Sequence, residues 1–198
     1  MFKLNTETEQ PKLKADEGEE DSTVETSGCK IFFYSEVNRD SVLSLNRQLI
    51  ELGNKLLNAS NVYEMPIPHI KLHINSGGGS LLDGFAAVDY IKACKAPVHS
   101  VIDGSAASAA TLMSVVAQRR SIHKHSFMLI HQLSGGAWGK YEDMVDDFKN
   151  STLFMDTINQ IYTQHTKIPL KTLKEMLKRD LWFDAKTCLK YGLVDEII

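Results

Sequence analysis

Apolar residues along the chain follow two alternating spacings, one typical of β-strands and one typical of α-helices. Strand-like runs are expected at 31–34, 70–74, 98–102, 119–123, 127–131 and 193–197. Helical spacing is expected at 41–57, 81–93, 106–117, 140–165, 170–177 and 185–190. Strands that alternate with helices at these separations predict an α/β domain with a largely parallel sheet.

The first 28 residues lack either spacing. They hold eight acidic residues and three lysines, with few large apolar side chains. A segment of this composition buries too little apolar surface to offset the entropy lost on ordering. We therefore expect a flexible acidic tail at 1–28 and a folded domain at 29–198.

Composition excludes several classes of protein. With 198 residues and 43% hydrophobic residues, the chain can form one domain with its own core. No apolar run approaches the roughly 18 residues of a membrane span, and no signal peptide is recognisable. A net charge of −3 gives no electrostatic reason to expect nucleic acid. Three widely spaced cysteines argue against a disulfide framework, so a cytoplasmic protein is expected.

Three glycines in succession, 77–79, follow the strand expected at 70–74. Without Cβ atoms their backbone N–H groups can approach a ligand closely. A tight connection is one interpretation, and an oxyanion hole is another. A phosphate loop is less favoured, because no lysine follows at the required spacing.

Small residues dominate the next strand–helix junction, 103–111. Ser108 is expected in the first turn of the helix, where free N–H groups favour an oxyanion or alkoxide. The alternative is close helix packing that needs small side chains, with Ser105 as the N-cap. The segment lacks the G-x-S-x-G spacing of α/β-hydrolases.

A histidine, His131, ends the strand expected at 127–131. A serine nucleophile needs an imidazole base and a third group to orient that base. Spacing alone does not select His131, since six other histidines are present: His69, His73, His99, His123, His125 and His165.

The segments INSGGGS (74–80), GSAAS (104–108) and MLIHQ (128–132) match one known family in order and separation, and YGLVD (191–195) matches that family's ending. Over roughly residues 30–198 the chain resembles ClpP, the proteolytic subunit of the Clp protease. The resemblance implies the spiral β-α-β superfold shared with crotonases, with a protruding handle helix at 140–165.

The resemblance also implies a serine endopeptidase that hydrolyses peptides and unfolded proteins without a cofactor or a metal. Ser108 corresponds to the nucleophile, His131 to the general base and Asp180 to the acid of the triad. Spacing favours Asp180 over Asp184 and Asp195 in this role.

Backbone groups of the family's site also have counterparts here. The N–H groups of Gly79 and Ala109 correspond to the oxyanion donors. Gly135, Gly136 and Ala137 correspond to a strand that binds substrate backbone by β-addition.

For assembly, the resemblance implies a homo-oligomer of heptameric rings, stacked through the handle helix as a tetradecamer, and an AAA+ unfoldase as partner.

Several features depart from the family. The tail is acidic, Lys71 and His73 replace aromatic residues of the unfoldase-docking pocket, and Lys178 replaces an acidic residue. Gly77 stands where the family has proline, and an insertion around 58–66 is expected to lengthen a loop. These departures predict a divergent ClpP, phage-encoded or organellar, that uses a different unfoldase or none.

Two alternative functions remain open at this stage. A viral head-maturation or scaffold protease would share the fold and the chemistry but would differ in its partner. A phage-encoded chain would act in the host cytoplasm, and an organellar one in the stroma or matrix. A crotonase-fold acyl-CoA enzyme or an inactive ring subunit would have no need of Ser108, His131 and Asp180 together.

Overall fold

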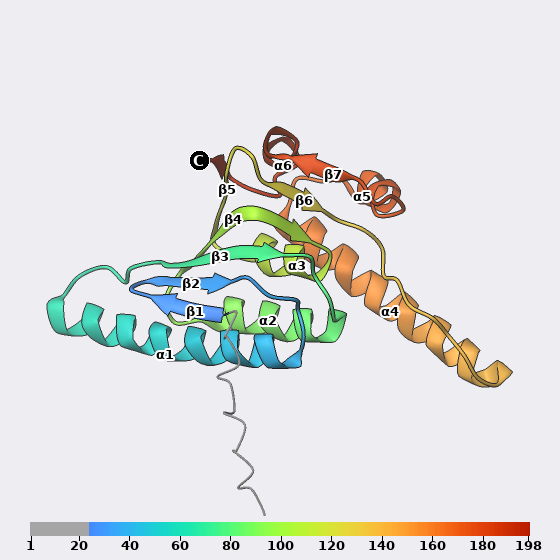
Figure 1. The fold of residues 1–198 in the computed structure, drawn as a ribbon, viewed down its shortest axis with the longest axis horizontal. Coiled ribbons are helices and arrows are strands. Elements are labelled where there is room, and N and C mark those ends of the chain that lie inside the picture. Colours follow the sequence, from blue (N-terminus) through green and yellow to red (C-terminus); the bar gives the residue numbers. More distant parts are fainter. Residues whose placement is uncertain (1–23) are drawn as a thin grey trace, which may run out of the picture.

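An eight-stranded mixed sheet organises the chain in the computed structural model, which describes residues 24–198 (Figure 1). Its main path runs β1-β2-β3-β4-β5-β8, while β6 pairs with β4 and β7 pairs with β6. Among the strand pairs of residues 24–198, only β1–β2 and β6–β7 are antiparallel. The strands are β1 (Val24–Ser27), β2 (Lys30–Phe33), β3 (Ile70–Ser76), β4 (Val98–Ala107), β5 (Arg119–Ile122), β6 (Phe127–Leu129), β7 (Trp182–Asp184) and β8 (Glu196–Ile197).

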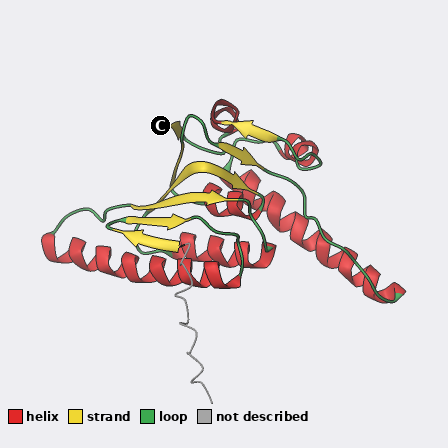
Figure 2. Cartoon of the chain, viewed as in Figure 1, coloured by secondary structure: helices red, strands yellow, loops and turns green. Residues whose placement is uncertain are grey.

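Six helices accompany the sheet in the described residues, one at each position that the apolar spacing predicts. They are α1 (Arg39–Tyr63), α2 (Leu81–Ala93), α3 (Ala109–Val115), α4 (Tyr141–His165), α5 (Leu170–Met176) and α6 (Ala185–Tyr191). Helices α1 and α2 lie side by side beneath the first three strands, and α3 packs between α2 and α4 (Figure 2). The α/β class is confirmed.

Helix α1 forms where the predicted apolar face meets the sheet. Val42, Leu45, Leu49, Leu52 and Leu56 are all buried there. The Asn38 side chain caps the first turn by accepting from two backbone N–H groups. The helix continues to Tyr63, so the expectation of a lengthened loop from residue 58 is wrong. Residues 58–63 instead form the last turns of the helix, and the left-handed backbone of Glu64 (φ 49°) ends it.

Strand β4 is longer than its apolar run predicts. Its first half pairs with β5 and its last three residues, 105–107, pair with β6. Ala106 and Ala107 therefore belong to the sheet, and α3 begins only at Ala109. Ser108 stands between strand and helix rather than inside the first helical turn.

The N-terminal boundary differs from the expected one. Residues 24–27 form β1, which pairs along its whole length with β2, and Gly28 provides the turn with a φ of 62°. The folded domain thus includes residues 24–28, which were expected to belong to the tail. The remainder of the expected tail, 1–23, lies outside the described residues.

Helix α4 projects from the body of the molecule, and the segment that follows β6 runs along it to its tip (Figure 1). Of its 25 residues only Ile158 and Tyr162 are buried, both in the half that meets the body. The protruding helix is therefore confirmed. Within residues 24–198, no helix is both long enough and apolar enough to cross a membrane.

Candidate active site

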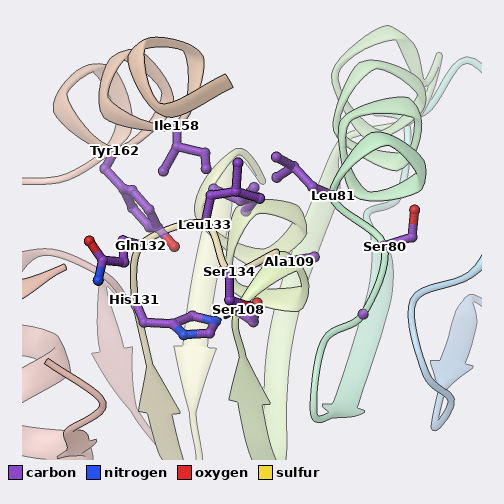
Figure 3. Close-up of a pocket in the computed structure, with 12 residues that line it drawn as sticks. Ser80, Leu81, Ser108, Ala109, His131, Gln132, Leu133, Ser134, Ile158 and Tyr162 are labelled. Atoms are coloured by element: carbon purple, nitrogen blue, oxygen red, sulfur yellow. Dashed lines mark hydrogen bonds between the residues drawn. The ribbon is translucent and has the colours of Figure 1, made fainter. Parts of the chain in front are cut away.

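Ser108 and His131 lie together because β4 and β6 are parallel neighbours. Ala107 pairs with Leu129, so the residues that follow both strands leave the sheet at the same edge. The Nε2 atom of His131 lies 2.8 Å from Oγ of Ser108 (Figure 3). At this distance the hydroxyl can donate its proton to the ring nitrogen.

Asp180 completes this arrangement from the segment between α5 and β7. Its Oδ1 atom lies 3.2 Å from Nδ1 of His131, and 79% of its side chain is exposed. The two competing carboxylates have other partners. Asp184 accepts from the backbone N–H of Thr187, and Asp195 accepts from Arg120. The structure thus brings together the three residues that the sequence analysis selected.

The backbone of Ser108 adopts an unusual conformation, with φ 53° and ψ −127°. A positive φ is costly for any residue with a Cβ and persists only when the surroundings hold it. Here the N–H of Ser108 donates to the carbonyl of Leu129 at 2.8 Å. Its own carbonyl accepts from the backbone N–H and from the hydroxyl of Thr111. The turn therefore presents Oγ to His131 from a backbone fixed on both sides.

The glycine turn packs directly against Ser108. A Cβ on Gly78, whose φ is 92°, would lie 2.6 Å from Cβ of Ser108 and 2.6 Å from the carbonyl oxygen of Ala107. Gly79 has φ 145°, and a Cβ there would meet the carbonyl oxygen of Val37 at 2.3 Å. Only glycine fits at these two positions.

Both expected oxyanion donors line the cavity that contains Ser108 and His131. This cavity has a volume of about 230 Å³, and its lining includes Gly79 and Ala109. Ala109 is the first residue of α3, so its N–H has no acceptor within the helix. The rest of the wall comes from α2 and its N-cap, α3, α4 and the segment after His131. Its apolar residues are Leu81, Leu112, Leu133, Ile158 and Tyr162, and its polar residues are Ser80, Gln132 and Ser134.

A larger groove continues from this cavity along α4. It has a volume of about 620 Å³ and shares Leu81 and Leu133 with the cavity. The segment Gly135–Ala137 lines one side, and Met144 and Phe148 of α4 line another. The expected substrate-binding segment therefore lies along a groove that adjoins the cavity of Ser108.

One feature of the site was missed by the sequence analysis. Tyr162 is fully buried in α4, and its hydroxyl pairs with the hydroxyl of Thr111, which bonds the carbonyl of Ser108. Burial raises the pKa of Tyr162 above its ordinary range. Nothing in the sequence pairs these two residues, which lie 51 positions apart.

Fold and site together have the geometry of a serine hydrolase built on an α/β sheet. The model of the Clp protease family matches residues 24–198. The ATP-dependent Clp protease proteolytic subunit 1 of Gloeobacter violaceus is 31% identical over 174 residues, which cover 85% of this chain and 88% of the relative. The chain belongs to the Clp protease family and is a peptidase core of the ClpP type. This membership favours the peptidase interpretation over the acyl-CoA enzyme.

Proposed function

We propose that Ser108, His131 and Asp180 form the catalytic triad of a serine endopeptidase that cleaves peptides and unfolded proteins. The observation that carries this proposal is the 2.8 Å separation between Nε2 of His131 and Oγ of Ser108, in a cavity with room for a substrate side chain.

The reaction begins when Oγ of Ser108 attacks a peptide carbonyl while its proton moves to Nε2 of His131. Asp180 holds the ring in the required tautomer and stabilises the imidazolium. The N–H groups of Gly79 and Ala109 stabilise the negative oxygen of the tetrahedral intermediate. His131 then gives its proton to the leaving amine, and water hydrolyses the acyl-enzyme. None of these steps consumes ATP.

The substrate backbone binds along Gly135–Ala137 by β-addition, in the groove next to the site. The side chain that precedes the cleaved bond enters the cavity beside Ser108, where Leu112, Leu133 and Ile158 form the apolar part of the wall. This part of the wall favours an apolar side chain of moderate size.

Assembly places these sites inside a chamber. We expect heptameric rings that stack through α4 as a tetradecamer in the cytoplasm, of a host cell if the chain is phage-encoded. The projecting half of α4 exposes Tyr141, Met144 and Phe148, and Trp138 just before it is 98% exposed. Apolar surface of this extent on a projecting helix favours contact with a second copy.

Docking of a standard bacterial unfoldase at the surface around β3 is disfavoured. Lys71 is exposed, and His73 is tied through Nδ1 to Asp103 at 2.7 Å. Apolar loops would have to desolvate these polar groups, at a cost in free energy. We expect no degradation of a folded, tagged substrate when the assembled chain is mixed with such an unfoldase and ATP. Efficient degradation would contradict this.

A fluorophosphonate probe tests the triad directly. We expect wild type to be modified at Ser108 and to cleave fluorogenic peptides, Ser108→Ala to show neither property, and His131→Ala to lose both while still assembling. Absence of labelling in a well-assembled wild-type sample, or wild-type peptidase activity in His131→Ala, would contradict the assignment.

A further inference from the structure

We propose that Thr111 and Tyr162 are positioning residues that hold the carbonyl of Ser108 and thereby aim the N–H of Ala109 at the oxyanion. This inference rests on the proposed function, because it concerns an interaction made only during peptide hydrolysis.

The direction of the hydrogen bonds between these residues follows from their chemistry. The hydroxyl oxygen of Thr111 lies 2.6 Å from the carbonyl oxygen of Ser108. A carbonyl only accepts, so the single hydroxyl proton of Thr111 is used there. The hydroxyl of Tyr162 must then be the donor in its bond to Thr111. The chain of donors runs from Tyr162 through Thr111 to the carbonyl of Ser108.

This chain acts on the oxyanion donor through a single peptide unit. The peptide bond between Ser108 and Ala109 is planar and trans, so its C=O and N–H point in opposite directions. Fixing the carbonyl against Thr111 therefore fixes the direction of the Ala109 N–H. Ser108 has φ 53° and ψ −127°, a combination that residues with a Cβ rarely adopt, so the backbone alone does not favour this orientation.

Tyr162 is suited to act as a permanent donor. It is buried in the part of α4 that meets the body, and a buried phenol needs a partner, which Thr111 provides. Burial raises the pKa of the phenol, which favours the protonated form that donates the hydrogen bond. The ring lines the cavity in Figure 3, while the hydroxyl bonds the side-chain hydroxyl of Thr111.

The test combines isosteric substitutions with steady-state kinetics on a fluorogenic peptide. We expect Thr111→Val to lower kcat about tenfold, a fraction of the loss seen when an oxyanion donor is removed outright. KM should stay within about twofold, since the interaction is made in the transition state. Thr111→Ser should retain most of the activity, because it keeps the hydroxyl. The inhibition constant of a peptide aldehyde should rise by the same factor as kcat/KM falls.

A double-mutant cycle separates positioning from general packing. Tyr162→Phe should lower kcat several-fold, and Thr111→Val/Tyr162→Phe should be no worse than Thr111→Val alone, because both act through one carbonyl. Thr163→Val is the matched control. Among the described residues, that hydroxyl bonds only carbonyls of its own helix, those of Asn159 and Gln160, so kcat should not change. Thermal unfolding and assembly are measured for every variant.

The outcomes distinguish failure of the positioning role from failure of the proposed function. Unchanged kcat in Thr111→Val, with wild type active, would overturn the positioning role and leave the proposed function intact. Fully additive losses in the double variant, or a rise in KM alone, would overturn it as well. An assembled wild type that neither labels nor cleaves would overturn the proposed function and this inference together.

Discussion

Only two of the three successive glycines need to lack a Cβ. Gly78 and Gly79 have positive φ angles and lie against backbone or against Ser108, whereas a Cβ on Gly77 would meet nothing within 4 Å. The position where the family has proline is therefore the tolerant one. The substitution to glycine at 77 loosens the unfolded chain without removing a contact that the site needs.

Replacing Gly78 with alanine should damage the site, because the new Cβ would clash with the Ser108 turn at 2.6 Å. We expect peptidase activity to fall at least about a hundredfold, as for loss of oxyanion stabilisation, together with a lower unfolding temperature. Gly77→Ala is the control and should keep its activity, with unfolding free energy unchanged or raised by about 0.4–1 kcal/mol. Equal activity of the two variants would refute the close packing at Gly78.

Asp180 differs from a buried triad acid in its high exposure. Asp180→Asn should lower kcat by about a hundredfold, less than for an enclosed aspartate, because solvent already screens its charge. Asp184→Asn is the matched control, since asparagine can still cap α6 and should leave kcat unchanged. Steady-state kinetics of both variants on one peptide at one pH would check this. A larger loss of kcat in Asp184→Asn than in Asp180→Asn would identify Asp184 as the acid of the triad instead.

At this scale the sequence was informative only where side chains belong to recognisable motifs. Ser108 and His131 lie at strand ends within such motifs, and the choice of Asp180 among the aspartates depended on family spacing. The pairing of Thr111 with Tyr162 depends on how α4 crosses α3, which is decided by tertiary packing. No local pattern contains that information.

Among the elements, the sheet buries a histidine on β4 that couples stability to pH. His99 is 8% exposed and bonds through Nε2 to Ser121 of β5, with Glu196 of β8 at 3.8 Å. Burial lowers the pKa of His99, and the cations of Arg119 and Lys71 lower it further, although Glu196 opposes them. Hydrogen bonds from Arg119 and Ser121 hold the pKa of Glu196 at about 2, so this carboxylate stays charged.

A histidine whose folded pKa lies below the unfolded value of 6.5 stabilises the fold fully above that pH, and this contribution is lost as the pH falls through the folded pKa. We therefore expect the free energy of unfolding to decrease below about pH 6.5. In His99→Asn the decrease should be smaller but not absent, because burial also lowers the pKa of His165. Urea denaturation between pH 8 and pH 5 measures the free energy of unfolding of wild type and of His99→Asn. If this free energy depended on pH equally in the two proteins, His99 would not be the source of the dependence.

Helix positions were easier to predict than strand boundaries. Leu81–Ala93 matches its predicted range, since Ser80 caps it and Pro97 follows soon after its end. The β4–α3 boundary was misplaced because alanine and serine fit either element, and pairing with β6 decides the outcome. Strands β1 and β7 have four and three residues and gave no apolar signal of their own. They form because a neighbouring strand offers a free edge.

At the scale of the whole molecule, the exposed apolar side chains on the projecting half of α4 favour contact with a second copy of the chain. We expect Phe148→Asp to shift the assembled protein to smaller species, because a charge would have to be buried at the contact. Thr163→Asp places the same charge on the exposed side of α4 near the body and should leave assembly intact. Light scattering coupled to gel filtration distinguishes them. If the Phe148→Asp variant kept the assembled size of wild type, α4 would not form the contact between copies.

The same helix can also report on assembly through its own backbone. Isolated helical turns without packing are marginally stable in water, so the turns from Tyr141 to about Ser151 should open readily in a free subunit. Their amide protons would then exchange quickly in dilute solution and slowly once copies associate. The turn that carries Tyr162 is packed on the body and should stay protected at every concentration. The exchange rate of the projecting turns, compared with that of the turn that carries Tyr162, would thus measure subunit association within a single helix.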